Sequence, residues 1–341
     1  LDADHISLKN VDFFIDICNF FTIDIAEEIN ASLSEDEERK LRNLILKLGF
    51  QTQLANLPIF QWNESFVANF LKTYGKALLE AQKIYRYILT KHSRQQNVIE
   101  ISMDEGPVAQ SAQEIYLILY LLTQLNVKLD TIAPRFAGLF LKGIDYQGNT
   151  EQFKNQTADF LKVLQWFQKH SGQPEHLKLS LHTGSDKFSL YPILNRLLNQ
   201  FQTGLHLKTA GTTWLEELIG LCEGGAAGLQ FVKSLYRSAI AQMDQLLQPY
   251  AAIVRIDRQN LPLPDELDNW NAEQLVRSLR HNQSDSLFNK DLRQLFHISY
   301  GLAAQYGNTF YELLETYRSE IERNVTENLF DRHIKPLFLG G

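Results

Sequence analysis

The sequence has few of the features that mark secreted, membrane-spanning or nucleic-acid-binding proteins. Its two cysteines, Cys18 and Cys222, lie far apart and outside any CxxC pattern, so neither a disulfide framework nor a thiolate metal site is indicated. No apolar run is long enough to cross a bilayer. The net charge of -7 argues against a surface that neutralises nucleic-acid phosphates. We therefore expect a cytoplasmic protein that acts on a small molecule, with no membrane or nucleic-acid partner.

What the sequence does contain is a series of short strands that end in polar residues. In residues 177–182, three leucines alternate with Lys178, Ser180 and His182. Such alternation places the leucines on one face of a strand and the polar residues on the other. A polar row that ends in histidine would suit the lumen of a closed barrel near its catalytic mouth.

Six further segments have the same character, and helical patterns long enough for βα crossovers separate the strands. These segments are residues 1–5, 20–26, 98–105, 127–135, 204–211 and 294–301. Consecutive strands joined by helices are most economically parallel. The sequence therefore predicts an α/β fold, a TIM-type (β/α) barrel with seven strands that forms a single domain over residues 1–341. Residues 251–270 are ambiguous, and we interpret them as an excursion before the last strand.

Residues 32–97 depart from this regular βα pattern. Ser34 and Glu37 form a capping box at the start of a helix that Gly49 ends. A second helix, at about residues 63–92, carries a broad apolar stripe that needs a partner. We interpret residues 32–97 as a helical insertion that either packs on the barrel or mediates self-association into a homo-oligomer.

Five motifs carry a family resemblance. They are DADHI near the start, SMDE at 102–105, APRFAGLFLKGIDY from Ala133, SLHTGSDKFSLYP from Ser180 and HLKTAGTTWLE from His206. Together they resemble the metal-dependent tagaturonate epimerase family, which interconverts tagaturonate and fructuronate in hexuronate catabolism. The resemblance implies an isomerase with a divalent metal cation and a sugar-acid substrate. Members of that family look longer at the N-terminus, so the resemblance also implies that the first barrel strand is missing from this chain.

Three side chains at or near strand ends are candidate metal ligands: Glu105, His182 and His206. The C-terminal ends of parallel barrel strands converge on one mouth. Two imidazoles and a carboxylate suit Zn²⁺, Mn²⁺, Co²⁺ or Ni²⁺ and leave positions open for a substrate. One or more of these histidines could instead be a hydrogen-bonded structural residue, and His5 and His297 are the alternatives for a ligand or a proton carrier.

Asp104 lies directly beside Glu105, and paired carboxylates often divide the roles of base and ligand. We predict Asp104 as the first acid/base group and His297 as the second. Lys208 would bind a substrate oxygen or carboxylate. The alternative for Asp104 is a salt bridge with Lys178 or Lys208.

The remaining candidates would bind the sugar acid. Arg135 is the first candidate for the substrate carboxylate because a guanidinium can hold a carboxylate with two hydrogen bonds. Lys142 and Lys187 are further candidates for that carboxylate. Hydroxyl groups of the substrate would bind Ser185, Asp186 and Thr209.

The expected reaction restricts the mechanism. The C4 hydrogen of a 2-ketohexuronate lies β to the ketone and is not acidic, so we expect C4 to be inverted by retro-aldol cleavage and re-formation of the C3–C4 bond. Two alternatives stay open. One is a metal-dependent isomerase or aldolase that acts on another sugar acid, and the other is a non-catalytic barrel that acts as an interaction protein.

Overall fold

The computed structural model describes residues 1–54, 57–209 and 211–340, which divide into two compact units. We call them the sheet unit and the helical unit. The sheet unit comprises Leu1–Ala137, Thr150–His182 and Leu197–Leu207. The helical unit comprises Gly138–Asn149, Thr183–Arg196 and Lys208–Gly341. The expected single barrel domain over the whole chain stays a prediction.

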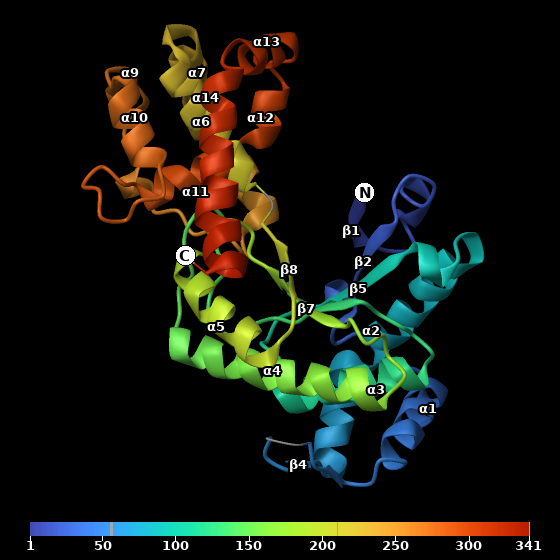
Figure 1. Ribbon diagram of the computed structural model, residues 1–341. Coiled ribbons are helices and arrows are strands. Elements are labelled where there is room, and N and C mark those ends of the chain that lie inside the picture. Colours follow the sequence, from blue (N-terminus) through green and yellow to red (C-terminus); the bar gives the residue numbers. More distant parts are fainter. Residues whose placement is uncertain (55–56, 210, 341) are drawn as a thin grey trace. The chain divides into compact units, whose positions relative to one another are not determined.

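The sheet unit is built on a six-stranded sheet in the order β1-β2-β5-β6-β7-β8 (Figure 1). Its strands are β1 (Asp2–Ile6), β2 (Phe20–Asp24), β5 (Val98–Ser102), β6 (Thr131–Ala133), β7 (Lys178–His182) and β8 (Leu205–Lys208). The pairings from β1 through β7 are parallel. Six of the predicted strands and the α/β class are therefore confirmed, whereas the described residues show no closed barrel.

The polar rows of neighbouring strands fall on one face of this sheet. Glu100 of β5 pairs in register with Thr22 of β2 on one side and with Thr131 of β6 on the other. The neighbours of Glu100 in the sequence, Ile99 and Ile101, are fully buried on the opposite face. Because side chains alternate along a strand, the register alone brings the polar side chains of β2, β5 and β6 together.

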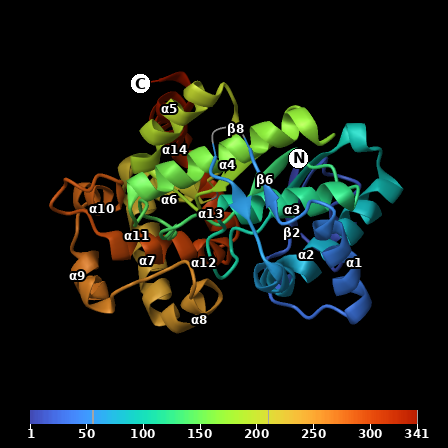
Figure 2. The same cartoon turned by 90° about the horizontal axis from the view of Figure 1, so that it is seen from below.

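Helices pack around the sheet within the same unit. They are α1 (Glu35–Leu46), α2 (Glu64–Lys91), α3 (Ala112–Gln124) and α4 (Thr150–His170), with short turns η1 (Val11–Phe13), η2 (Ala26–Glu28) and η3 (Arg94–Gln96). The predicted capping box of Ser34 and Glu37 is present at the start of α1. The helices α1 and α2 contact each other and α3, as Figures 1 and 2 show, and α2 also contacts β2. Strands β3 (Gln51–Thr52) and β4 (Phe60–Gln61) form a short antiparallel pair.

The helical unit has its own apolar core, centred on α6 (Thr212–Gly224) and α7 (Ala226–Ala241). Its other elements are η4 (Phe188–Leu190), α8 (Met243–Leu247), η5 (Gln248–Tyr250), η6 (Arg258–Asn260), α9 (Pro264–Asp268), α10 (Ala272–Leu279), α11 (Lys290–Ile298), α12 (Tyr300–Ala304), α13 (Asn308–Thr316), α14 (Arg318–Thr326) and the π-helix η7 (Glu327–Leu339). Helix α5 (Tyr191–Phe201) has residues in both units. None of the described helices is long and apolar enough to span a membrane.

The predicted seventh strand at residues 294–301 is wrong, because this segment forms the end of α11 and the start of α12. The side chain of Asn289 caps α11 by accepting hydrogen bonds from two backbone N–H groups. Three buried apolar residues follow at helical spacing, namely Leu292, Leu295 and Phe296. Residues 251–270 also contain no strand, and η6 and α9 lie there instead.

Candidate functional site

The polar face of the sheet is centred on the fully buried carboxylate of Glu100. Its Oε1 accepts a hydrogen bond from Thr22 Oγ1 at 3.2 Å and lies 2.8 Å from His182 Nε2. Its Oε2 accepts from Thr131 Oγ1 at 2.7 Å and lies 2.9 Å from His206 Nδ1. The structure therefore brings the two predicted histidines together, on one carboxylate.

His182 also contacts Asp104, whose Oδ1 lies 3.2 Å from the His182 Nδ1. Burial by itself would lower the pKa of His182, but the hydrogen bonds with Asp104 and Glu100 outweigh it and raise this pKa to about 10. Burial likewise works against ionisation of Asp104, and the contact with His182 nevertheless lowers the pKa of the carboxyl. At neutral pH the two side chains therefore form an imidazolium–carboxylate pair.

His206 is the more accessible of the two histidines, with 27% of its side chain exposed. Its Nδ1 contacts Glu100 and also lies 3.2 Å from Ser180 Oγ. The ring packs against Phe20, with 4.8 Å between the ring centroids. His206 Nε2 is the ring nitrogen that these contacts do not use.

Glu105, the predicted third ligand, does not join this cluster. Its Oε1 lies 4.0 Å from Nε2 of His5, and nearly half of the Glu105 side chain is exposed. The Nδ1 of His5 lies 3.7 Å from Asp4 and 3.8 Å from Asp24. Burial raises the pKa of Asp24, and the neighbouring Asp104 and Asp4 add to this increase. Glu105 and His5 thus belong to a separate acidic cluster, at a cavity of about 570 Å³ in the sheet unit.

The anchoring of the two histidines is typical of metal-binding histidines, but the described residues do not supply a third ligand beside them. A metal-bound histidine usually donates its second ring N–H to a carboxylate or carbonyl. Glu100 anchors His182 and His206 in this way, which leaves Nε2 of His206 for a ligand, whereas Nδ1 of His182 lies 3.2 Å from Asp104 Oδ1. However, across residues 1–54, 57–209 and 211–340 no three His, Cys, Asp or Glu side chains form a group that could hold a metal ion.

Arg135 is a predicted substrate-binding residue that the structure places beside this cluster. Its Nη1 donates a hydrogen bond to the backbone carbonyl of Asp104 at 3.1 Å. Its own backbone N–H donates to Gln110 Oε1 at 2.6 Å, which holds the chain just after β6. The guanidinium is therefore positioned next to the Asp104–His182 pair.

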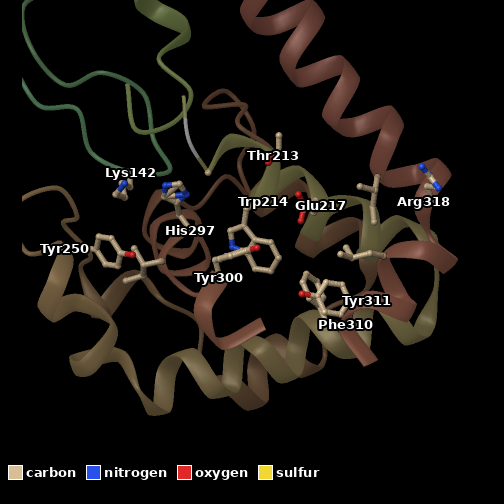
Figure 3. Close-up of a pocket in the computed structure, with 14 residues that line it drawn as sticks. Lys142, Thr213, Trp214, Glu217, Tyr250, His297, Tyr300, Phe310, Tyr311 and Arg318 are labelled. Carbon is tan, nitrogen blue, oxygen red and sulfur yellow. The ribbon is translucent and has the colours of Figure 1, made fainter. Parts of the chain in front are cut away.

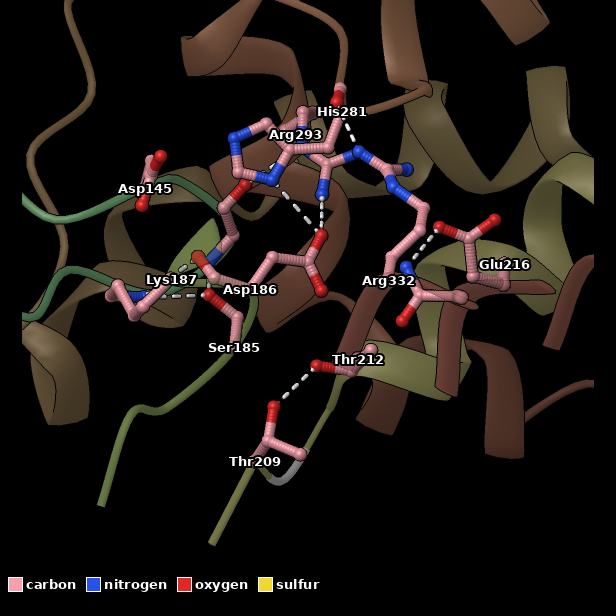
Figure 4. A network of polar contacts seen from close by, with 12 residues as sticks. Asp145, Ser185, Asp186, Lys187, Thr209, Thr212, Glu216, His281, Arg293 and Arg332 are labelled. Atoms are coloured by element: carbon pink, nitrogen blue, oxygen red, sulfur yellow. Dashed lines mark hydrogen bonds and ion pairs between the residues drawn. The ribbon is translucent and has the colours of Figure 1, made fainter. Parts of the chain in front are cut away.

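Three other predicted substrate contacts lie buried inside the helical unit, as Figure 4 shows. The Asp186 carboxylate contacts His281 Nδ1 and Arg293 Nη2, each at 3.0 Å. The hydrogen bond with His281 and the charge of Arg293 keep the pKa of Asp186 far below its ordinary value in spite of burial. The Lys187 Nζ donates to Ser185 Oγ at 3.0 Å, and burial lowers the pKa of Lys187 to about 7. The side chains of Ser185, Asp186 and Lys187 are at most 1% exposed, and their contact with a substrate stays a prediction.

Lys142 and His297 line one cavity of about 630 Å³ in the helical unit, as Figure 3 shows. The Lys142 Nζ lies 5.7 Å from the ring centroid of Tyr250. Burial lowers the pKa of His297 to about 3, with Lys142 and Arg293 acting in the same direction, so His297 is a neutral imidazole. Of the last two candidates, Thr209 bonds Thr212 through its hydroxyl at 2.7 Å, and Lys208 ends β8.

Sequence reasoning missed the central residue of the cluster. Glu100 lies in the same polar row as Ser102 and Asp104, and a glutamate in the middle of a strand with buried neighbours was the available signal. The partners of Asp186, namely His281 and Arg293, lie far away in sequence and carry no comparable signal.

The parallel sheet and its carboxylate–histidine face define an α/β protein with a buried cluster of titratable side chains on the sheet. Residues 1–337 match the family model of tagaturonate epimerase, and the chain belongs to this family. The resemblance found in the motifs is thus confirmed.

Individual relatives agree with this assignment. The chain is 25% identical over 350 residues to the tagaturonate/fructuronate epimerase of Thermotoga maritima, an alignment that covers 98% of this chain and 66% of the relative. A glycerol-complexed crystal structure of fructuronate-tagaturonate epimerase from Cohnella laeviribosi is also 25% identical, with a TM-score of 0.77 over 98% of this chain and 67% of that one. The chain therefore spans about two thirds of the length of these relatives.

Proposed function

We propose that this protein interconverts tagaturonate and fructuronate by inverting C4 of the 2-ketohexuronate. One observation carries the proposal: the family match runs through residues 1–337, and the structure gathers Asp104, Arg135, His182 and His206 from the family-like motifs around one polar cluster. The parallel strand order and the polar face of the sheet also support a (β/α) barrel as the complete architecture.

In the reaction that we propose, Asp104 accepts the proton of the C4 hydroxyl group. The C3–C4 bond then breaks and leaves an aldehyde at C4 and an enediolate at C2 and C3. The aldehyde turns, the same bond forms on its other face, and Asp104 returns the proton to the C4 oxygen. The contact with His182 lowers the pKa of Asp104 and so keeps this carboxyl ionised before the first step, as a proton acceptor must be. Arg135 would hold the substrate carboxylate.

A divalent cation, Zn²⁺, Mn²⁺, Co²⁺ or Ni²⁺, is part of the proposal. When bound, such a cation stabilises the negative charge that develops on substrate oxygens. His206 would hold it through Nε2, and His182 would hold it through Nδ1 after that nitrogen had lost its proton and its contact with Asp104, since Glu100 occupies the other nitrogen of each ring. Glu105 would have to leave His5 to serve as the third ligand.

The test begins with the purified chain, tagaturonate and a panel of divalent metals added after treatment with a chelator. We expect fructuronate to form, and we expect His182→Ala and His206→Ala to abolish its formation and to lower the metal content. His170→Ala, at an exposed position of α4, is the matched control and should change neither. Absence of conversion by the unsubstituted chain with every metal would refute the proposed activity.

The retro-aldol route has its own test in deuterated water. Cleavage of the C3–C4 bond leaves the C4 hydrogen on its carbon, so the product should contain no deuterium at C4. Direct removal of that hydrogen would exchange it with solvent. Deuterium at C4 in the fructuronate, detected by NMR, would contradict the retro-aldol route and leave the epimerase activity itself standing.

A further inference from the structure

We propose that Glu100 is the positioning residue of this site. It holds the two imidazole rings by opposite nitrogens, His182 by Nε2 and His206 by Nδ1, so that Nδ1 of His182 faces Asp104 and Nε2 of His206 is presented to a ligand. The proposal names a residue for the function proposed above, and its activity readout rests on that function.

Four contacts of Glu100 are divided evenly between its two oxygens. Its Oε1 contacts Thr22 and His182, and its Oε2 contacts Thr131 and His206. The distances from these oxygens to the partner atoms are 2.7 to 3.2 Å. An ionised carboxylate has about four lone-pair positions for hydrogen bonds. These contacts therefore use its accepting capacity on both sides and leave it poorly suited to bind a substrate itself.

The sheet register explains why a carboxylate is stable at this position. Thr22 and Thr131 are the residues that pair with Glu100 on the two neighbouring strands, so each hydroxyl reaches the carboxylate from its own side. Removing a carboxylate from water is costly unless hydrogen bonds replace the lost solvation. The two hydroxyls and the two imidazole N–H groups supply this replacement for a side chain that is 0% exposed.

The consequence for the histidines is that their ring orientation and the position of one proton are both determined. An imidazole that donates one N–H to a carboxylate keeps that nitrogen protonated, which decides which nitrogen is left for other chemistry. The same carboxylate contacts Nε2 of His182 and Nδ1 of His206, so it keeps opposite nitrogens of the two rings protonated. Asp104 lies next to the Nδ1 that His182 presents, as proton transfer at that nitrogen requires.

The decisive variant is Glu100→Gln, which keeps the size of the side chain and replaces one accepting oxygen by a donating NH₂ group. We expect kcat to fall by about 10- to 100-fold, the usual effect of losing a residue that orients a metal-binding histidine, with a smaller change in KM. Glu216→Gln makes the same exchange at another buried glutamate, in the helical unit, and should leave kcat unchanged.

A spectroscopic measurement separates positioning from general support of the fold. With ¹⁵N-labelled histidine, long-range proton–nitrogen NMR reports which ring nitrogen carries the proton. In the unsubstituted protein we expect protons on both ring nitrogens of His182, which contacts Glu100 and Asp104, and on Nδ1 of His206. At least one of these assignments should be lost in Glu100→Gln, and both should persist in Glu216→Gln. Unchanged ring assignments together with unchanged kcat in Glu100→Gln would overturn the proposal.

If Glu100→Gln fails to fold, substitutions at Thr131 decide the question. Thr131→Val removes one hydroxyl from the carboxylate and keeps its charge, so we expect a smaller loss of kcat and a shifted His206 ring signal. Thr131→Ser restores the hydroxyl and should restore both readouts, and a Ser variant as impaired as the Val variant would count against the proposal. If the unsubstituted chain does not epimerise tagaturonate but the ring signals respond as expected, the proposed function fails and the positioning role of Glu100 stands.

Discussion

Glu216 provides a quantitative prediction of how stability depends on pH. This buried carboxyl of α6 has its pKa raised to about 7, mainly by burial, with a further contribution from the charge of Asp186. Three arginines act in the opposite direction without reversing the effect. The Nδ2 of Asn328 donates a hydrogen bond to Glu216 Oε1 at 2.9 Å. The folded protein therefore binds a proton here at pH values where the unfolded chain has already released it.

The sign and the size of the effect follow from this difference. Between the ordinary value of 4.5 and about 7, the folded state binds more protons than the unfolded state, so the free energy of unfolding falls as the pH rises through this range. Since each pH unit corresponds to about 1.4 kcal/mol, the loss amounts to about 3 kcal/mol once the pH exceeds 7.

Glu216→Gln should remove this dependence. Glutamine does not titrate, and its side-chain oxygen can still accept the hydrogen bond from Asn328. We expect the free energy of unfolding of the variant, measured relative to the unsubstituted protein by urea denaturation, to rise by about 3 kcal/mol between pH of about 4.5 and about 8. Taking the difference between the two proteins cancels the titration of all groups that they share. An equal difference at both pH values would refute the reasoning.

Three further predictions concern single side chains. Asp104→Asn should lower kcat by about 10²- to 10⁴-fold because it removes proton transfer. The metal content should stay unchanged because the variant keeps an oxygen beside His182. Loss of the metal from this variant would make Asp104 a ligand. Arg135→Ala should raise KM for a hexuronate far more than for the matching neutral ketose, since a charge-assisted contact is lost; an equal increase for both substrates would contradict that role. Gly211→Ala should destabilise the protein by about 1–3 kcal/mol in a thermal unfolding experiment. The reasons are that the Gly211 φ is +81° and that an added Cβ would lie 2.0 Å from His297 Cε1. An unchanged melting temperature would contradict the close contact.

The strands of the sheet unit could be predicted because their sequence pattern has one structural interpretation. In β7, apolar and polar residues alternate strictly, and in β5 they alternate from Ile99 onward. The helix after β5 begins with a capping box at Ser111. A parallel arrangement then follows from the length of the connections. The same pattern also indicated correctly that the polar rows share one face of the sheet.

The segment at residues 294–301 has no such single interpretation. Its alternation of Phe296 and Ile298 with His297 and Ser299 covers only four residues and fits either a strand or a turn of helix. What decides between them is Asn289, which caps α11 and lies five residues before that segment. A window that begins at Asn289 contains the helical spacing of Leu292, Leu295 and Phe296, and this longer pattern favours the helix.

The candidate site shows the same dependence on information outside a local motif. Glu105 was chosen as a ligand because it follows a strand, but β5 ends at Ser102, and beyond this residue the direction of a side chain is no longer set by strand alternation. Glu105 lies instead beside His5. Glu100 lies within β5, where the register with β2 and β6 determines its direction, and both histidines meet it there. The sequence predicted a glutamate beside two histidines. Only the pairing of the strands shows that the glutamate in contact with them is Glu100 and not Glu105.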